Sequence, residues 1–130
     1  MACRITDSRR IQVFEENGRK LTLNNSNIVE TVRIEVDGCE INDATIRCDY
    51  MLMVNPKDLD IYIELKGTNL DHAKKQIIAT HARLGINNEK RAYIVCSRVP
   101  KGTDHQAVKF ELKRKGIQTT IVSNQGVDHF

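Results

Sequence analysis

Two strand-like runs joined by a tight turn constrain the fold of this chain more than any other feature. Residues 44–54 end in YMLMV, residues 59–66 read LDIYIELK, and the NPKD between them has Asn and Pro where a type I turn prefers them. If Val54 pairs with Leu59, the alternation of side chains predicts one continuous apolar face. That face consists of Ile46, Cys48, Tyr50, Leu52 and Val54 opposite Gly67, Leu65, Ile63, Ile61 and Leu59. The pattern therefore predicts an antiparallel hairpin that buries this face.

The other face of the same hairpin gathers charge. Asp49 lies opposite Glu64, with about 5 Å between the Cβ atoms, and Lys66 follows on the same side. Two carboxylates so close repel each other unless a cation or a shared proton compensates them. Oxygen ligands at this separation suit Mg²⁺ or Mn²⁺, with the backbone carbonyl of Leu65 as a third ligand. The alternative is a cross-strand salt-bridge cluster on a solvent-exposed sheet face.

A divalent ion beside an amine predicts one class of chemistry. The ion lowers the pKa of a bound water and neutralises charge that develops on a phosphate. Lys66 can then position or deprotonate that water, or stabilise the charged phosphate electrostatically. The residues therefore predict metal-dependent hydrolysis of phosphodiester bonds.

The first half of the chain is expected to be mostly β-structure. Asn17-Gly18 and Asp37-Gly38 each follow strand-like runs with alternating apolar residues. These dipeptides tolerate the positive φ of tight turns, and they indicate hairpins or looser loops.

The second half changes to a helical period. A helix is expected over residues 69–84, where Thr68 and Asp71 resemble a capping box and Gly85 ends the helix. His81 interrupts the apolar stripe of this helix, which favours a buried, hydrogen-bonded histidine over a ligand. A strand, a second helix and a last strand are expected over residues 91–97, 104–115 and 117–123. This order predicts a mixed α/β fold in which the late strands join the hairpin through helical crossovers.

Composition indicates one domain over residues 1–130. The chain is 40% hydrophobic and 28% charged, and no stretch is long and apolar enough for a membrane span. The N-terminal residues do not resemble a secretory signal, so a cytoplasmic location is expected. The four cysteines are widely and irregularly spaced, and we expect reduced thiols. The net charge of +3 permits a polyanionic partner without requiring one.

The charged residues of the hairpin resemble the PD-(D/E)XK nuclease superfamily. The resemblance rests on Asp49 in one strand and on IELKG, with Glu64 and Lys66, in the next strand before a helix. It implies a restriction-endonuclease-like core over about residues 30–123, with residues 1–29 as an N-terminal strand extension. In that core an antiparallel strand meander is followed by helix, strand, helix and strand.

The same resemblance implies roles for single residues. Asp49 and Glu64 would bind Mg²⁺ or Mn²⁺, Lys66 would be the catalytic lysine, and Gln76 would support the site. Exonuclease-like branches have an aromatic residue four places after this glutamine, where the present chain has Thr80.

The expected activity is that of a small nuclease acting on double-stranded or branched DNA, and the sequence leaves both endonuclease and exonuclease cleavage open. The short chain leaves little for base recognition, so a homodimer or a partner protein is expected to select the substrate. Lys101, Lys113 and Arg114 are candidate phosphate contacts, although the run KFELKRKG also fits a solvated helix end. The alternatives are an RNA substrate, or a non-catalytic protein-binding or inhibitor module of the phage or bacterial-conflict type on the same fold.

Overall fold

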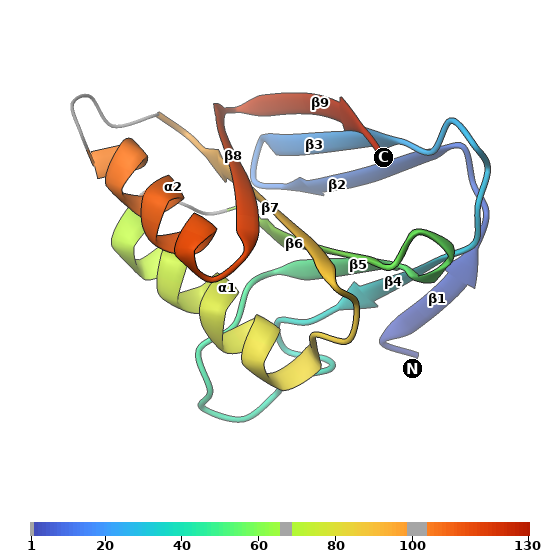
Figure 1. Ribbon diagram of the computed structural model, residues 1–130, viewed down its shortest axis with the longest axis horizontal. Helices are drawn as coiled ribbons and strands as arrows, with labels where there is room; N and C mark the ends of the chain where they lie inside the picture. Colours follow the sequence, from blue (N-terminus) through green and yellow to red (C-terminus); the bar gives the residue numbers. More distant parts are fainter. Residues whose placement is uncertain (1, 66–68, 99–103) are drawn as a thin grey trace.

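The protein has a mixed α/β fold whose larger sheet carries both antiparallel and parallel strands. The computed structural model describes residues 2–65, 69–98 and 104–130 (Figure 1). The larger sheet has the strand order β1-β4-β5-β6-β7-β8. Its strands are β1 Arg4–Asp7, β4 Thr31–Glu35, β5 Tyr50–Val54, β6 Leu59–Glu64, β7 Glu89–Cys96 and β8 Ile117–Ser123. β1, β4, β5 and β6 pair antiparallel, whereas β6, β7 and β8 pair parallel. The predicted mixed α/β class is confirmed.

Two helices make the crossovers that parallel pairing requires. Helix α1 Leu70–Leu84 connects β6 to β7, and helix α2 Asp104–Arg114 connects β7 to β8. Both were expected within a residue or two of these bounds. Within the described ranges, no helix has the length and apolar character needed to cross a membrane.

A second, smaller sheet joins the two ends of the chain. It consists of β2 Ile11–Glu16, β3 Arg19–Asn24 and β9 Gln125–His129. β2 and β3 pair antiparallel, and β9 adds parallel to β3, with Leu21 opposite Gly126. Residues 1–29, expected as an N-terminal strand extension, thus supply β1 to the larger sheet and β2 and β3 to the smaller one.

The larger sheet is covered on both faces. Figure 1 shows α1 and α2 on one side of it and β2, β3 and β9 on the other. On the helix side, sheet residues pack against α1 in a cluster that includes Met51, Met53, Tyr62, Leu70, Ala73 and Ile77. On the other side, a second cluster includes Phe14, Leu21, Leu23, Leu52, Ile61 and Ile63. Burial on both faces explains why β5 and β6 are almost continuously apolar.

The hairpin of β5 and β6 has the predicted register. Val54 lies opposite Leu59 and Tyr50 opposite Ile63. The connection is a single 3-10 turn over Asn55–Lys57 rather than a simple type I turn, and it ends at Asp58 with φ +52°. The expected strand over residues 44–54 is too long, because β5 begins only at Tyr50. Before it, Ile46 is 44% exposed and Cys48 packs on the helix side, so the expectation that both share the other apolar face is wrong.

The two glycine turns have different outcomes. Asn17 and Gly18, with φ of +50° and +79°, form the predicted hairpin turn between β2 and β3. Gly38 also has positive φ, at +77°, but the chain continues into a loop with an isolated bridge between Asp37 and Ile41. This turn is therefore the looser loop.

Side-chain and backbone contacts fix the ends of α1. Asn69 is the N-cap, and its side-chain oxygen accepts a hydrogen bond of 3.1 Å from the His72 amide. Thr68, the expected cap, lies outside the described residues. Gly85 ends the helix without positive φ, and a Cβ atom there would lie 2.7 Å from the His81 carbonyl oxygen and 2.8 Å from the Tyr62 hydroxyl. Glycine is required by this close approach.

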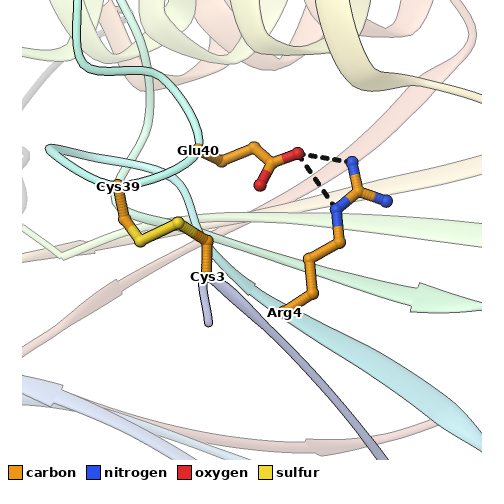
Figure 2. The surroundings of a disulfide bond; sticks show 4 residues. All are labelled: Cys3, Arg4, Cys39 and Glu40. Carbon is orange, nitrogen blue, oxygen red and sulfur yellow. Dashed lines mark hydrogen bonds and ion pairs between the residues drawn. A yellow bond between two sulfur atoms is a disulfide. The ribbon is translucent and has the colours of Figure 1, made fainter. Parts of the chain in front are cut away.

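A disulfide links the first strand to the loop after β4. Cys3 and Cys39 are bonded, with Cα atoms 5.6 Å apart (Figure 2). Beside them the Arg4 guanidinium binds the Glu40 carboxylate at 2.6 Å. The expectation of reduced thiols is therefore wrong for this pair, whereas Cys48 and Cys96 are free and buried.

Candidate functional site

Two buried carboxylates lie at the end of the β5–β6 hairpin. Glu64 is the last residue of β6, and Asp49 precedes β5, one step beyond the pair of Tyr50 and Ile63. Continuing the register places Asp49 opposite Glu64 on the face that packs against α1. Their side chains are only 5% and 2% exposed. The part of the alternative that places these two residues on a solvent-exposed sheet face is therefore wrong.

Both carboxylates line one pocket of about 450 Å³, which we call the acidic pocket. Its walls come from the end of the hairpin, from the loop that precedes β5 and from the first turns of α1. The lining residues are Asp37, Ala44, Thr45, Ile46, Arg47, Asp49, Glu64, Asn69, His72 and Gln76. Eight of these ten residues are polar or charged, so the acidic pocket suits a polar or charged ligand better than an apolar one.

Backbone groups orient Asp49. The amide of Leu65 donates a hydrogen bond of 2.8 Å to the Oδ2 atom of Asp49. The carbonyl oxygen of Asp49 accepts from the amides of Val36, at 3.0 Å, and Asp37, at 3.3 Å. The Leu65 backbone, expected to supply a third ligand, thus lies directly beside the Asp49 side chain.

Arginines organise the loop that forms one wall. Arg47 forms an ion pair of 2.9 Å with Asp37 and donates to the carbonyl oxygens of Asp43 and Thr45. Arg83 of α1 binds the Asp43 carboxylate at 2.9 Å. Hydrogen bonds from Thr45, together with Arg83, hold the pKa of Asp43 well below its usual range. The loop is therefore anchored by ionic contacts rather than by strand pairing.

Helix α1 presents a polar stripe to the acidic pocket. Asn69, His72 and Gln76 follow the helical spacing that places side chains on one face. The Nε2 atom of Gln76 donates a hydrogen bond of 3.0 Å to the Arg47 carbonyl oxygen. Sequence reasoning identified Gln76 but missed Asn69 and His72, although their spacing from Gln76 was a usable signal.

The neighbouring cysteine is a neutral group. Cys48 is fully buried and adjacent to Asp49 in the chain. Burial raises the pKa of the Cys48 thiol to about 12. The Cys48 thiol is therefore not an anionic group beside the acidic pocket.

The other predicted residues are not at the acidic pocket or are not described. Lys66 and Lys101 lie outside the described residues. Lys113 and Arg114 are exposed at the C-terminal end of α2, and neither lines the acidic pocket. Glu111, in the second ELK triplet, is on α2 and binds Lys74 at 2.5 Å, as a solvated helix face predicts.

No preformed cluster of metal ligands accompanies the two carboxylates. Over residues 2–65, 69–98 and 104–130, no group of three or more His, Cys, Asp or Glu side chains could hold a metal ion. A divalent ion here would take its side-chain oxygens from Asp49 and Glu64 and its other ligands from backbone, water or substrate.

Comparisons of the chain with protein-family models, with curated proteins and with solved structures find no match.

Proposed function

We propose that the protein is a Mg²⁺- or Mn²⁺-dependent nuclease that hydrolyses phosphodiester bonds in DNA. One observation carries the proposal. Asp49 and Glu64 are buried at adjacent strand ends, and both line one polar pocket of about 450 Å³. A chain seldom buries two carboxylates together without a role for their charge.

The donor set fits Mg²⁺ better than a structural metal. Mg²⁺ is usually held by one or two carboxylates, several waters and substrate phosphates, rather than by a complete cage of protein ligands. Asp49 and Glu64 supply the two carboxylates, and the Leu65 backbone lies beside Asp49. When bound, such an ion supplies an activated water and neutralises charge on the phosphate.

The residues of the chain have separable tasks in this proposal. The Leu65 amide fixes the rotation of the Asp49 carboxylate, so that one oxygen stays turned toward the backbone of β6. Lys66, which follows in the sequence, would position or deprotonate the attacking water. Gln76 and the Arg47 loop form the wall against which the substrate backbone would lie.

The fold supports a restriction-endonuclease-like core as part of the same proposal. Antiparallel β4, β5 and β6 are followed by α1, β7, α2 and β8, which is the element order that the PD-(D/E)XK resemblance implies. A homodimer, or a partner protein that selects double-stranded or branched DNA, and a cytoplasmic location complete the proposal.

Cleavage and Mn²⁺ binding test the proposal together. Supercoiled plasmid and a branched DNA substrate would be incubated with Mg²⁺ or Mn²⁺, and Mn²⁺ binding would be measured by titration calorimetry. Asp49→Asn, Glu64→Gln and Lys66→Ala are expected to reduce cleavage at least about 100-fold, as is usual when an electrostatic contact to the reacting centre is removed. Asp49→Asn and Glu64→Gln should also lose Mn²⁺ binding.

The second ELK triplet offers the matched control. Glu111→Gln makes the same chemical change in an exposed residue of α2 and should retain Mn²⁺ binding and cleavage. A wild-type protein that neither binds Mn²⁺ nor cuts DNA would overturn the proposal in favour of a binding module. Equal cleavage by wild type and the three site variants would overturn the assignment of the residues.

A further inference from the structure

The segment that delivers Asp49 to the acidic pocket has no regular secondary structure. The residues between Ile41 and Tyr50 belong to neither a strand nor a helix. A carboxylate on such a segment needs other contacts to hold its orientation, because an isolated loop samples many backbone conformations. The hydrogen bonds around residues 47–49 identify these contacts.

One peptide group of the segment is held from both sides by α1. The peptide bond between Arg47 and Cys48 offers one carbonyl oxygen and one amide hydrogen. The carbonyl oxygen accepts from Gln76 Nε2 at 3.0 Å, and the amide donates to Thr80 Oγ1 at 2.9 Å. Gln76 and Thr80 are four residues apart, which places them one turn apart on the same side of the helix. The plane of this peptide is therefore fixed relative to α1.

Thr80 is committed to this contact by its surroundings. Its side chain is fully buried, and its hydroxyl also donates a hydrogen bond of 2.8 Å to the Gln76 carbonyl oxygen one turn earlier. The hydroxyl donates its single proton to the Gln76 carbonyl oxygen. Its oxygen lone pair is then available to accept the hydrogen bond from the Cys48 amide. A side chain of equal shape without oxygen would leave that buried amide without a partner.

On its other side, the segment is fixed by β4 and the turn after it. The Asp49 carbonyl oxygen accepts from the amides of Val36 and Asp37. Asp49 is therefore held at two points. The Arg47–Cys48 peptide before it is bound to α1, and its own carbonyl oxygen is bound to the turn after β4. Only the backbone rotations of Cys48 and Asp49 separate the two anchors, and both side chains are buried.

We propose that Thr80 is a positioning residue, which acts with Gln76 through the Arg47–Cys48 peptide to hold Asp49 in its metal-binding orientation. The inference rests on the proposed function for the identity of the ligand. Thr80 touches neither metal nor substrate, and its effect passes entirely through the backbone. Contacts of this kind, one shell away from a ligand, typically change metal affinity 10- to 100-fold.

The test compares hydroxyl removal with hydroxyl retention. Thr80→Val keeps the shape of the side chain and loses the hydroxyl, whereas Thr80→Ser keeps the hydroxyl. Mn²⁺ titration calorimetry on the folded protein should give a Kd at least about 10-fold higher for Thr80→Val and a Kd within about twofold of wild type for Thr80→Ser. Cleavage by Thr80→Val should recover at high Mn²⁺, because the defect lies in metal binding rather than in chemistry.

Thr119→Val is the matched control, because Thr119 is also buried, at 5% exposure, and its hydroxyl has no hydrogen-bond partner among the residues that the structure describes. This variant should bind Mn²⁺ as wild type does. Gln76→Met removes the other half of the peptide contact from a half-buried position and should weaken Mn²⁺ binding in the same direction, which keeps the test available if Thr80→Val folds poorly.

Two results separate this inference from the proposed function. Wild type that binds Mn²⁺, with unchanged Kd values in Thr80→Val and Gln76→Met, would overturn the positioning role alone. Wild type that binds no Mn²⁺ would overturn both.

Without metal, hydrogen exchange of the Cys48 amide should be at least about 10-fold faster in Thr80→Val than in Thr80→Ser. Equal exchange rates would also overturn the positioning role.

Discussion

Buried acidic side chains in the larger sheet have different surroundings at its two ends. Asp60, at the start of β6, accepts hydrogen bonds from the amides of Ile86 and Asn87 at 2.8 and 2.9 Å and from the Asn87 side chain at 2.9 Å. These bonds fix the turn from α1 into β7. Asp49 and Glu64 lie at the opposite end and line a pocket. Burial alone therefore does not distinguish the two carboxylates that we propose as metal ligands from Asp60, whereas the pocket beside them does.

Single residues were predictable where local pattern determines their environment. His81, expected as a buried, hydrogen-bonded histidine, is only half-buried, but it forms the expected hydrogen bond, at 2.8 Å with the Tyr62 hydroxyl. The pair of Cys3 and Cys39 was not predictable, because spacing does not reveal which distant segments meet. Reduced thiols would fit the expected cytoplasmic location, so the disulfide removes part of the support for that expectation.

His81 predicts a pH dependence of stability. Burial, and then the charge of Lys90, lower the pKa of His81 from its ordinary value of 6.5. The unfolded chain therefore takes up a proton at a higher pH than the folded protein does. The contribution of neutral His81 to stability is therefore complete above about pH 6.5. It is lost as the pH falls through the lowered pKa that His81 has in the folded protein.

Chemical denaturation between pH 7.5 and pH 5 checks this prediction. The free energy of unfolding of wild type should fall on acidification more steeply than that of His81→Gln, which keeps a hydrogen-bonding group but does not titrate. Equal slopes for the two proteins would show that His81 does not contribute.

At the scale of elements, the position of the tight turn made the register of the β5–β6 hairpin predictable. Once Val54 pairs with Leu59, every other pair follows, because a slip of one residue would move the side chains of one strand to the opposite face relative to its partner. The start of β5 was missed because residues 44–48 resemble a strand in sequence, while ionic contacts of Arg47 and Arg83 hold them as a loop. Strand β9 was missed because its sequence, QGVDH, has no alternating apolar pattern.

The Cys3–Cys39 disulfide is expected to stabilise β1 and the loop after β4 together. It joins residues 36 apart, and crosslinks over loops of this length typically contribute about 2–4 kcal/mol. Cys39→Ser should lower the free energy of unfolding in urea by that amount. A reducing agent should bring wild type to the same value and leave the variant unchanged.

The ion pair beside the disulfide provides the control. Arg4→Ala removes a partly exposed contact to Glu40 and should change stability by less than about 1 kcal/mol. A reducing agent without effect on wild type would contradict the proposed contribution of the crosslink.

At the scale of the whole molecule, two layers cover the larger sheet, and only one of them was predictable. The helices followed from periodicity and from the handed crossovers of parallel strands. The smaller sheet depends on β9 pairing with β3, and Asn24 and Asp128, which meet there, are 104 residues apart. No local pattern encodes such a contact.

Phe130 tests how much this second layer contributes. Its side chain is 5% exposed within the cluster that includes Phe14 and Leu23, and its amide binds the Asn24 carbonyl oxygen. Phe130→Ala should lower the free energy of unfolding in urea by about 3 kcal/mol. Val127→Ala, in a side chain 73% exposed on the same strand, should change it by less than about 0.5 kcal/mol.

The pairing of β3 with β9 sets an order of events during synthesis. The β2–β3 hairpin leaves the ribosome well before its third strand, because β4 to β8 and both helices lie between them in the chain. Until then the apolar residues of β5 and β6 that face this layer lack most of their cover, which is a condition that favours chaperone binding or aggregation. We therefore expect nascent chains stalled before residue 125 to remain protease-sensitive, and chains in which β9 has left the ribosome to become resistant.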